Sequence, residues 1–159
     1  MKTTDKDRQF EMLIEQELSK FRGIAHSILN HPADADDAVQ EALFKAYQRF
    51  ETFKSGASLS SWVCRIVINC SYDILRKRKR EQDALGGYTP PAPRPDTSAL
   101  EEAIAELHEP YRDAIVIGVL SGFSGKEAAK ILGISPNVLY QRIYKAKQML
   151  KNTLTKEDN

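Results

Sequence analysis

The segment 123–150, FSGKEAAKILGISPNVLYQRIYKAKQML, constrains the fold more than any other part of the chain. Ser124 and the glutamate three residues later have the spacing of a capping box, which predicts the start of a helix. Gly133 can adopt the left-handed conformation that ends a helix. Ser135 then suits the N-cap of a second helix, with Pro136 at its first position. The segment is therefore predicted to fold as a helix, a tight turn and a second helix.

The second of these helices separates into two faces when its residues are placed about 100° apart. The predicted buried stripe consists of Leu139, Ile143, Ala146 and Leu150. The opposite face consists of Asn137, Gln141, Tyr144 and Gln148, with Lys145 beside them. Amide side chains can pair with an adenine edge, and cations can meet guanine or phosphate. Two interpretations follow: a DNA-binding helix-turn-helix, or an ordinary amphipathic hairpin with a solvated face.

Length and composition exclude several classes of protein. With 159 residues, the chain can form one modest domain or two small ones. No apolar run is long enough to span a membrane and the first residues lack a signal-peptide core, so we expect a cytoplasmic protein. Cys64 and Cys70 are expected to be small buried side chains. We find no metal-ligand spacing, nucleotide-binding glycine loop or hydrolase motif, and expect neither a cofactor nor an enzyme.

The near-neutral net charge of +1 hides strong segregation along the chain. In residues 64–80, six basic residues and one acidic residue give +5, and in residues 111–159, eight and four give +4. Between them, in residues 81–110, one basic and seven acidic residues give −6. Two separate basic blocks indicate two contacts with a polyanion rather than one broad basic surface.

Helical periodicity extends over almost the whole chain and predicts an all-α fold of two small helical domains. The N-terminal domain is predicted to contain three helices, over residues 8–30, 33–50 and 59–79. Four more are predicted in the C-terminal domain, over residues 98–107 and 110–120 and in the helix-turn-helix. Between the domains, residues 86–95, GGYTPPAPRP, have the composition of an extended linker. The predicted boundaries are 1–80 for the first domain, 81–97 for the linker and 98–159 for the second domain.

The second predicted helix has an unusual outer face. Asp37, Gln40, Glu41 and Gln48 fall within one narrow arc, and Phe44 lies in the middle of it. A solvated face is one interpretation of such a charged arc. One apolar anchor ringed by polar groups is also typical of a protein-binding surface.

The third predicted helix carries a basic stripe. Arg65, Asn69, Tyr72 and Arg76 are predicted to line one side, and the helix continues into a run of basic residues, RKRKR, at 76–80. The cations can meet phosphate, the tyrosine can stack on a base and the asparagine can read a base edge. Complementing the dipole of the helix would account for only one or two of these cations. The preceding loop, Phe53–Ser58, could close over a base, although most such loops are only turns.

These pieces, in this order, resemble the sigma factors of bacterial RNA polymerase, in particular the small extracytoplasmic-function (ECF) group. DADDAVQEALFKAYQRF resembles the core-binding helix of region 2. SLSSWVCRIVINCSYDILRKRKR resembles the −10 recognition helix, with its W-x-x-x-I-x-x-N pattern and basic end. The stretch from ELHEPYRDAIVIG to the end of the helix-turn-helix resembles region 4. The resemblance covers residues 10–80 and 98–151.

The resemblance implies a role for each face. Docking on the β′ clamp helices of core polymerase falls to Asp37, Gln40, Glu41, Phe44 and Gln48. Contacts with the −10 DNA fall to Phe53, Lys54, Ser55, Ser58, Ser60, Trp62, Arg65, Asn69, Tyr72 and Arg76. Reading of the −35 DNA falls to Ser135, Asn137, Val138, Tyr140, Gln141, Arg142, Tyr144 and Lys145.

The resemblance also implies partners and one departure. The implied partners are core RNA polymerase, through its β′ clamp helices and β flap, promoter DNA and an anti-sigma factor, with no catalysis by the chain itself. Where the family commonly has G-T-V-K-S-R, this chain has NVLYQR at 137–142, which allows a different −35 preference. A stand-alone helix-turn-helix regulator, which would bind duplex DNA without polymerase, stays open as the alternative.

Overall fold

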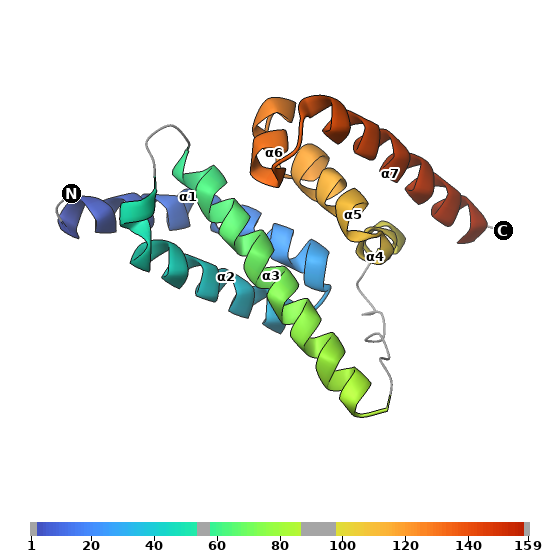
Figure 1. The fold of residues 1–159 in the computed structure, drawn as a ribbon, viewed down its shortest axis with the longest axis horizontal. Helices are drawn as coiled ribbons and strands as arrows, with labels where there is room; N and C mark the ends of the chain where they lie inside the picture. The colour runs from blue at the N-terminus through green and yellow to red at the C-terminus, as the bar shows by residue number, and fades with distance from the viewer. Residues whose placement is uncertain (1–2, 54–57, 87–97, 158–159) are drawn as a thin grey trace. The chain divides into compact units, whose positions relative to one another are not determined.

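A computed structural model describes residues 3–53, 58–86 and 98–157, and all the regular structure in these ranges is helical (Figure 1). The chain divides into two compact units, residues 1–74 and 75–159. The predicted all-α class with two small helical units is therefore confirmed. Across the described ranges, no helix has the length and apolar character needed to cross a bilayer.

The first unit contains α1 (Thr3–Leu29), α2 (Pro32–Gln48), the short 3₁₀ helix η1 (Phe50–Thr52) and α3, which begins at Leu59 and ends at Ala84 beyond the unit boundary. α1 and α2 pack side by side. Phe10, Leu13, Phe21 and Ile24 form the buried side of α1, whereas Ile14 is 39% exposed.

α3 is longer than the sequence pattern predicted. It continues past Lys79 to Ala84, into the start of the predicted linker. Glu81, Gln82 and Ala84 favour a helix there, and the first glycine after Lys79 is Gly86. The boundary between the two units lies between Ile74 and Leu75, inside α3. The rest of the predicted linker, residues 87–97, lies outside the described residues.

Both cysteines lie in the core of α3, which confirms their predicted role. Cys64 and Cys70 are 0% and 2% exposed. Burial raises the pKa of the Cys70 thiol, which favours its protonated form.

A row of aromatic rings connects the three helices of the first unit. Phe10 makes edge contacts with Tyr47 and Phe50, at centroid distances of 5.3 and 5.7 Å. Phe50 contacts Phe53 at 6.0 Å, and Phe53 contacts Trp62 at 5.3 Å. Offset and edge-to-face pairs of this kind add to the stabilisation that burial gives. The row ends in the contact between Phe53 and Trp62, which joins the end of η1 to the first turn of α3.

The second unit contains the C-terminal end of α3 together with α4 (Ala99–Glu106), α5 (Glu109–Ile115), the π-helix η2 (Val116–Leu120), α6 (Gly125–Leu132) and α7 (Pro136–Glu157). α4, α5 and α6 all contact α7, which is the central helix of the unit. The predicted helix-turn-helix corresponds to α6 and α7. Its buried residues Leu139 and Ala146 are both 0% exposed.

Helix ends of this unit are capped, and the caps predicted at Ser124 and Gly133 are confirmed. The Oγ of Ser98 accepts a hydrogen bond from the amide of Glu101 at 3.1 Å. The Oγ of Ser124 accepts one from the amide of Glu127 at the same distance. Gly133 ends α6 with φ 70°, in the left-handed region where glycine is favoured.

The predicted single helix over 110–120 is interrupted. After Ile115 the backbone widens into the π-helix η2, and the Oγ of Ser121 donates to the carbonyl of Val116 at 2.6 Å. The wider turn lets the four consecutive residues 114–117 all be buried, which a regular α-helix with one apolar stripe does not allow. Gly118 then lies close to α7, where a Cβ would meet Cδ1 of Ile143 at 2.8 Å.

Candidate functional site

The outer face of α2 presents the predicted arc of polar residues. Its inner face is formed by buried small residues, including Ala38, Ala42 and Ala46, each 0% exposed. The predicted core-binding residues are exposed on the other side: Asp37, Gln40, Glu41, Phe44 and Gln48. Phe44 is 62% exposed, which is unusual for a phenylalanine. The structure therefore brings together an apolar anchor and a polar surround.

One cation lies beside this arc and belongs to the same helix. Nζ of Lys45 is 3.0 Å from Oε1 of Glu41. The hydrogen bond to Glu41 is the main reason that the pKa of Lys45 is raised, and Asp73 on α3 adds to the effect. Of the two carboxylates in the arc, that of Glu41 is therefore paired with a cation of its own helix.

The predicted basic stripe on α3 is exposed at three of its four positions. Arg65, Asn69 and Arg76 lie on the surface, as do all five residues of the basic run 76–80. Tyr72 does not: it is 4% exposed, so the expectation that its ring stacks on a base is wrong for this structure. Its neighbours on α3, Ile68 and Ser71, are buried as well, so the buried side of the helix is wider here than the periodicity predicted.

The residues at the start of α3 play a structural part. Phe53 and Trp62 are half-buried and contact each other in the aromatic row. Ser58 is exposed, and its Oγ accepts a hydrogen bond from the amide of Ser61 at 3.1 Å. The half-buried Ser60 keeps an Oγ without a hydrogen-bond partner in the described structure. Lys54 and Ser55, also predicted to contact −10 DNA, lie outside the described residues.

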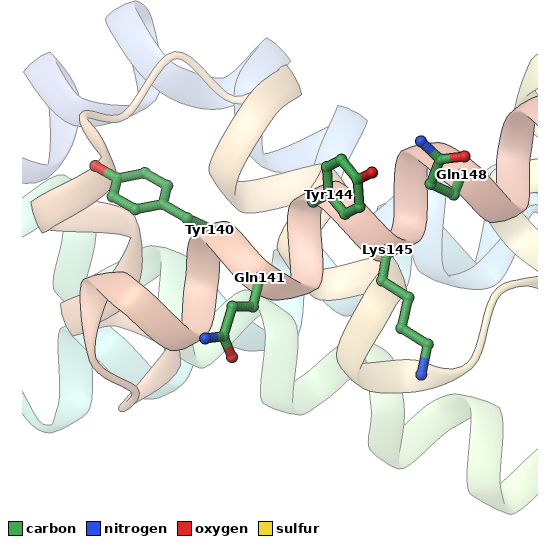
Figure 2. A pocket seen from close by; sticks show the side chains of 5 residues that line it. All are labelled: Tyr140, Gln141, Tyr144, Lys145 and Gln148. Atoms are coloured by element: carbon green, nitrogen blue, oxygen red, sulfur yellow. The ribbon is translucent and has the colours of Figure 1, made fainter.

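The outer face of α7 contains a shallow groove of about 510 Å³ (Figure 2). Its lining residues are Tyr140, Gln141, Tyr144, Lys145 and Gln148. Tyr140 and Tyr144 are 56% and 69% exposed, and they are one helical turn apart. The groove thus combines aromatic surface, amide groups and a single cation on the predicted −35 face.

The other predicted −35 residues flank this groove. Asn137 is exposed, whereas Val138 and Arg142 are half-buried. Ser135 caps α7, because its Oγ accepts a hydrogen bond from the amide of Val138 at 3.2 Å. Its hydroxyl is therefore used within the helix.

Sequence reasoning missed two residues that position this face. Nζ of Lys145 lies 5.4 Å from the ring centroid of Tyr111 on α5, a cation–π contact that holds the lysine at the flank of the groove. Gly125, the first residue of α6, leaves space for the ring of Tyr140. A glycine directly after an N-cap serine was the available signal, but nothing in the sequence indicated which side chain it would meet.

Comparison with known proteins assigns a family to this arrangement. The model for Sigma-70 region 2 matches residues 13–81, and the model for Sigma-70, region 4 matches residues 97–150. The first match contains the α2 and α3 faces, and the second contains the helix-turn-helix.

Relatives match over most of their length. The ECF RNA polymerase sigma factor EcfG of Rhodopseudomonas palustris is 33% identical over 84% of this chain and 78% of that protein. The RNA polymerase sigma factor SigV of Bacillus subtilis is 31% identical, over 87% of this chain and 86% of that protein.

Solved structures agree in fold. The sigma factor RpoE of Bartonella quintana, solved with the anti-sigma factor NepR, has a TM-score of 0.78 and 29% identity over 93% of this chain and 98% of that one. CnrH, solved with the cytosolic domain of CnrY, has a TM-score of 0.75 and 25% identity over 94% of this chain and 89% of that one. Two region models in the order of the family, and relatives above 30% identity over most of both chains, lead to one conclusion. The chain belongs to the sigma-70 family and is an RNA polymerase sigma factor of the ECF group.

Proposed function

We propose that the three exposed faces each bind a different partner during promoter recognition, two of them in an N-terminal domain and one in a C-terminal domain. The N-terminal domain, residues 1–80, docks on core RNA polymerase and holds −10 DNA. The C-terminal domain, residues 98–159, holds the −35 element, and residues 81–97 connect the two. The observation that carries this proposal is the outward placement of the α2, α3 and α7 residues within the two matched regions.

The α2 face is assigned to the β′ clamp helices of core polymerase. Phe44 supplies the apolar anchor, and Asp37, Gln40, Glu41 and Gln48 supply the polar surround. An exposed ring that is covered on binding yields more free energy than any one of the solvated charges around it. Such an anchor surrounded by polar groups is the usual composition of an interface hot spot.

The α3 face is assigned to −10 DNA. Arg65, Arg76 and the basic run 76–80 are positioned for phosphates, and Asn69 for a base edge. Trp62 and Phe53 contact each other across this part of the chain, and Ser58 and Ser60 lie at the start of α3. Tyr72 is left out of this contact set because it is buried.

The α7 face is assigned to the major groove of −35 DNA. Gln141 can offer the NH₂ group and the carbonyl oxygen of its amide to an adenine. Lys145 lies at the flank of the α7 face, where it can meet phosphates. Asn137, Val138, Tyr140, Arg142 and Tyr144 complete the face. Ser135 acts by capping the helix.

Two further partners are part of the proposal. The solved neighbours named above are complexes with NepR, an anti-sigma factor, and with the cytosolic domain of CnrY, and an anti-sigma factor is proposed for this chain as well. The β flap of core polymerase is proposed as the partner of the C-terminal domain. Both partners, and the proposed action of the chain as a non-catalytic subunit, place it in the cytoplasm.

Transcription by purified core polymerase tests this proposal. Adding the full chain should produce initiation at a subset of promoters in a genomic library, with start sites downstream of shared −10 and −35 elements. A stand-alone regulator would bind the same duplexes without polymerase and would give no initiation with core enzyme alone. Failure to associate with core polymerase would overturn the proposal.

A further inference from the structure

The ring of Tyr140 occupies the space that a side chain at residue 125 would need. A Cβ built on Gly125 would meet Cε1 and Cζ of Tyr140 at 3.0 Å, and would meet the hydroxyl oxygen more closely still. Gly125 is the first residue of α6, directly after the N-cap Ser124. The two helices of the helix-turn-helix therefore meet at this glycine and this tyrosine, at the end of the groove on α7.

This contact determines which part of Tyr140 faces outward. The hydroxyl end of the ring lies toward α6, and Figure 2 shows the side chain extended away from Gln141. Tyr140 nevertheless remains 56% exposed. The surface that it offers to a partner is therefore mainly ring carbon rather than hydroxyl.

Within a major groove, such an apolar surface matches one group on the base edges. The C5 methyl of thymine is the only apolar group that the four base pairs display there. Gln141, the next residue, can pair with an adenine. The neighbouring ring and amide of α7 together suit A·T pairs.

We propose that Tyr140 selects a thymine in the −35 element through its methyl group, and that Gly125 is the positioning residue that fixes the ring for this contact. The inference rests on the proposed function, because it requires α7 to lie in the major groove of −35 DNA. Tyr140 is the specificity-determining residue, and Gly125 acts only through it.

The methyl group itself can be removed in the test. Holoenzyme is assembled from core polymerase and the full chain, and binding is measured on promoters with a fixed −10 element and a randomised −35 element. At the base pair where thymine is preferred, deoxyuridine is then substituted for it. The wild-type chain should bind about fourfold more weakly without the methyl, the effect of one buried carbon. Tyr140→Ala should show no methyl dependence, and Tyr140→Phe should retain it.

The role of Gly125 is tested with a matched pair of substitutions. Gly125→Ala should reduce the methyl dependence at the same base pair, because the new methyl group displaces the ring. Gly23→Ala in α1, where a Cβ would meet nothing within 4 Å, should leave it unchanged. In the Tyr140→Ala background, Gly125→Ala should have no further effect on base preference, whereas in the Tyr144→Ala background its effect should persist. Thermal unfolding should show that Gly125→Ala remains folded, since alanine favours a helix more than glycine does.

The outcomes separate the inference from the proposed function. Methyl dependence that survives in Tyr140→Ala would overturn the thymine contact, and a Gly125→Ala effect that persists without Tyr140 would overturn the positioning role. In either case, a changed −35 preference in Gln141→Ala would leave the proposed function intact. Wild-type holoenzyme without preference at any −35 base pair would overturn both.

Discussion

Phe44 is a residue whose exposure the packing of the fold does not explain. The ring is 62% exposed on a helix whose opposite face is already filled by small buried residues. It therefore contributes little to folding, and its exposed area is available to a partner.

The first prediction concerns this residue. Phe44→Ala should weaken binding to core polymerase about 30-fold, which corresponds to about 2 kcal/mol for a hot-spot residue. The free energy of unfolding should stay within about 0.5 kcal/mol of wild type, because the ring is largely exposed. Titration of labelled core polymerase and denaturant unfolding measure the two effects. Met12→Ala, at a residue 50% exposed on α1, is the control; equal losses for both variants would contradict the assigned face.

Arg112 shows the opposite case, a charged residue whose role is structural. It is 9% exposed, and its Nη2 donates to the carbonyls of Ala105 and Leu107 at 2.7 Å each. These two carbonyls lie at the C-terminal end of α4, where a helix leaves acceptors unsatisfied.

The second prediction follows from these two hydrogen bonds. Arg112→Met should lower the free energy of unfolding of the second unit by about 3 kcal/mol, since it leaves two carbonyls without their charged donor. Hydrogen exchange of the α4 and α5 amides during urea unfolding measures the loss. Lys130→Met, an exposed change on α6, should cost less than about 0.5 kcal/mol. Unchanged protection in Arg112→Met would refute the assigned role.

Among the elements, η2 is a π-helix that packs against α7. Its wide turn and Gly118 let the backbone approach the central helix closely. The side of α7 that carries Leu139 and Ile143 therefore packs against a segment that has no side chain at residue 118.

A third prediction tests this close approach. Gly118→Ala places a Cβ 2.8 Å from Cδ1 of Ile143 and 3.3 Å from Cδ1 of Leu139, and should cost about 1–3 kcal/mol by overpacking. Ile143→Val removes the first of these two methyl groups. The double variant should therefore be destabilised by less than the sum of the two single variants, a coupling that thermal unfolding measures. If the destabilisations of the two single variants simply add in the double variant, the contact between residues 118 and 143 does not limit the packing.

For the molecule as a whole, the positive charge is distributed unevenly between the exposed faces of α3 and α7. The run 76–80 concentrates exposed cations on α3, whereas the α7 groove contains Lys145 as its single cation. Phosphate contacts give affinity without sequence information, whereas base contacts distinguish one sequence from another.

The fourth prediction compares one residue from each surface. Arg76→Ala should weaken binding of the holoenzyme to all its promoters by a similar factor and lower the slope of log affinity against log salt by about 0.7–0.9. Gln141→Ala should change the −35 preference and leave the salt slope as it is. Binding to a promoter panel at several salt concentrations measures both. Promoter-selective losses in Arg76→Ala would contradict its role as a phosphate contact.

Local patterns in the sequence determined the elements and most of the exposed faces. Ser124 and Gly133 cap α6 where the sequence predicted, because capping depends on residues three or four positions apart. The same holds for the arc around Phe44 and the outer face of α7, since helical periodicity alone sorts their residues into buried and exposed.

Only the tertiary structure decided contacts between distant segments. Periodicity placed Tyr72 on the basic stripe, but it is buried together with Ile68 and Ser71. The π-helix η2 packs against α7, a contact that local propensity did not indicate. Likewise, Tyr140 against Gly125 and Lys145 against Tyr111 are contacts between residues 15 and 34 positions apart, whose meeting depends on how the helices cross. A pattern of period 3.6 specifies which side of a helix a residue occupies, but not what the neighbouring helix brings to that side.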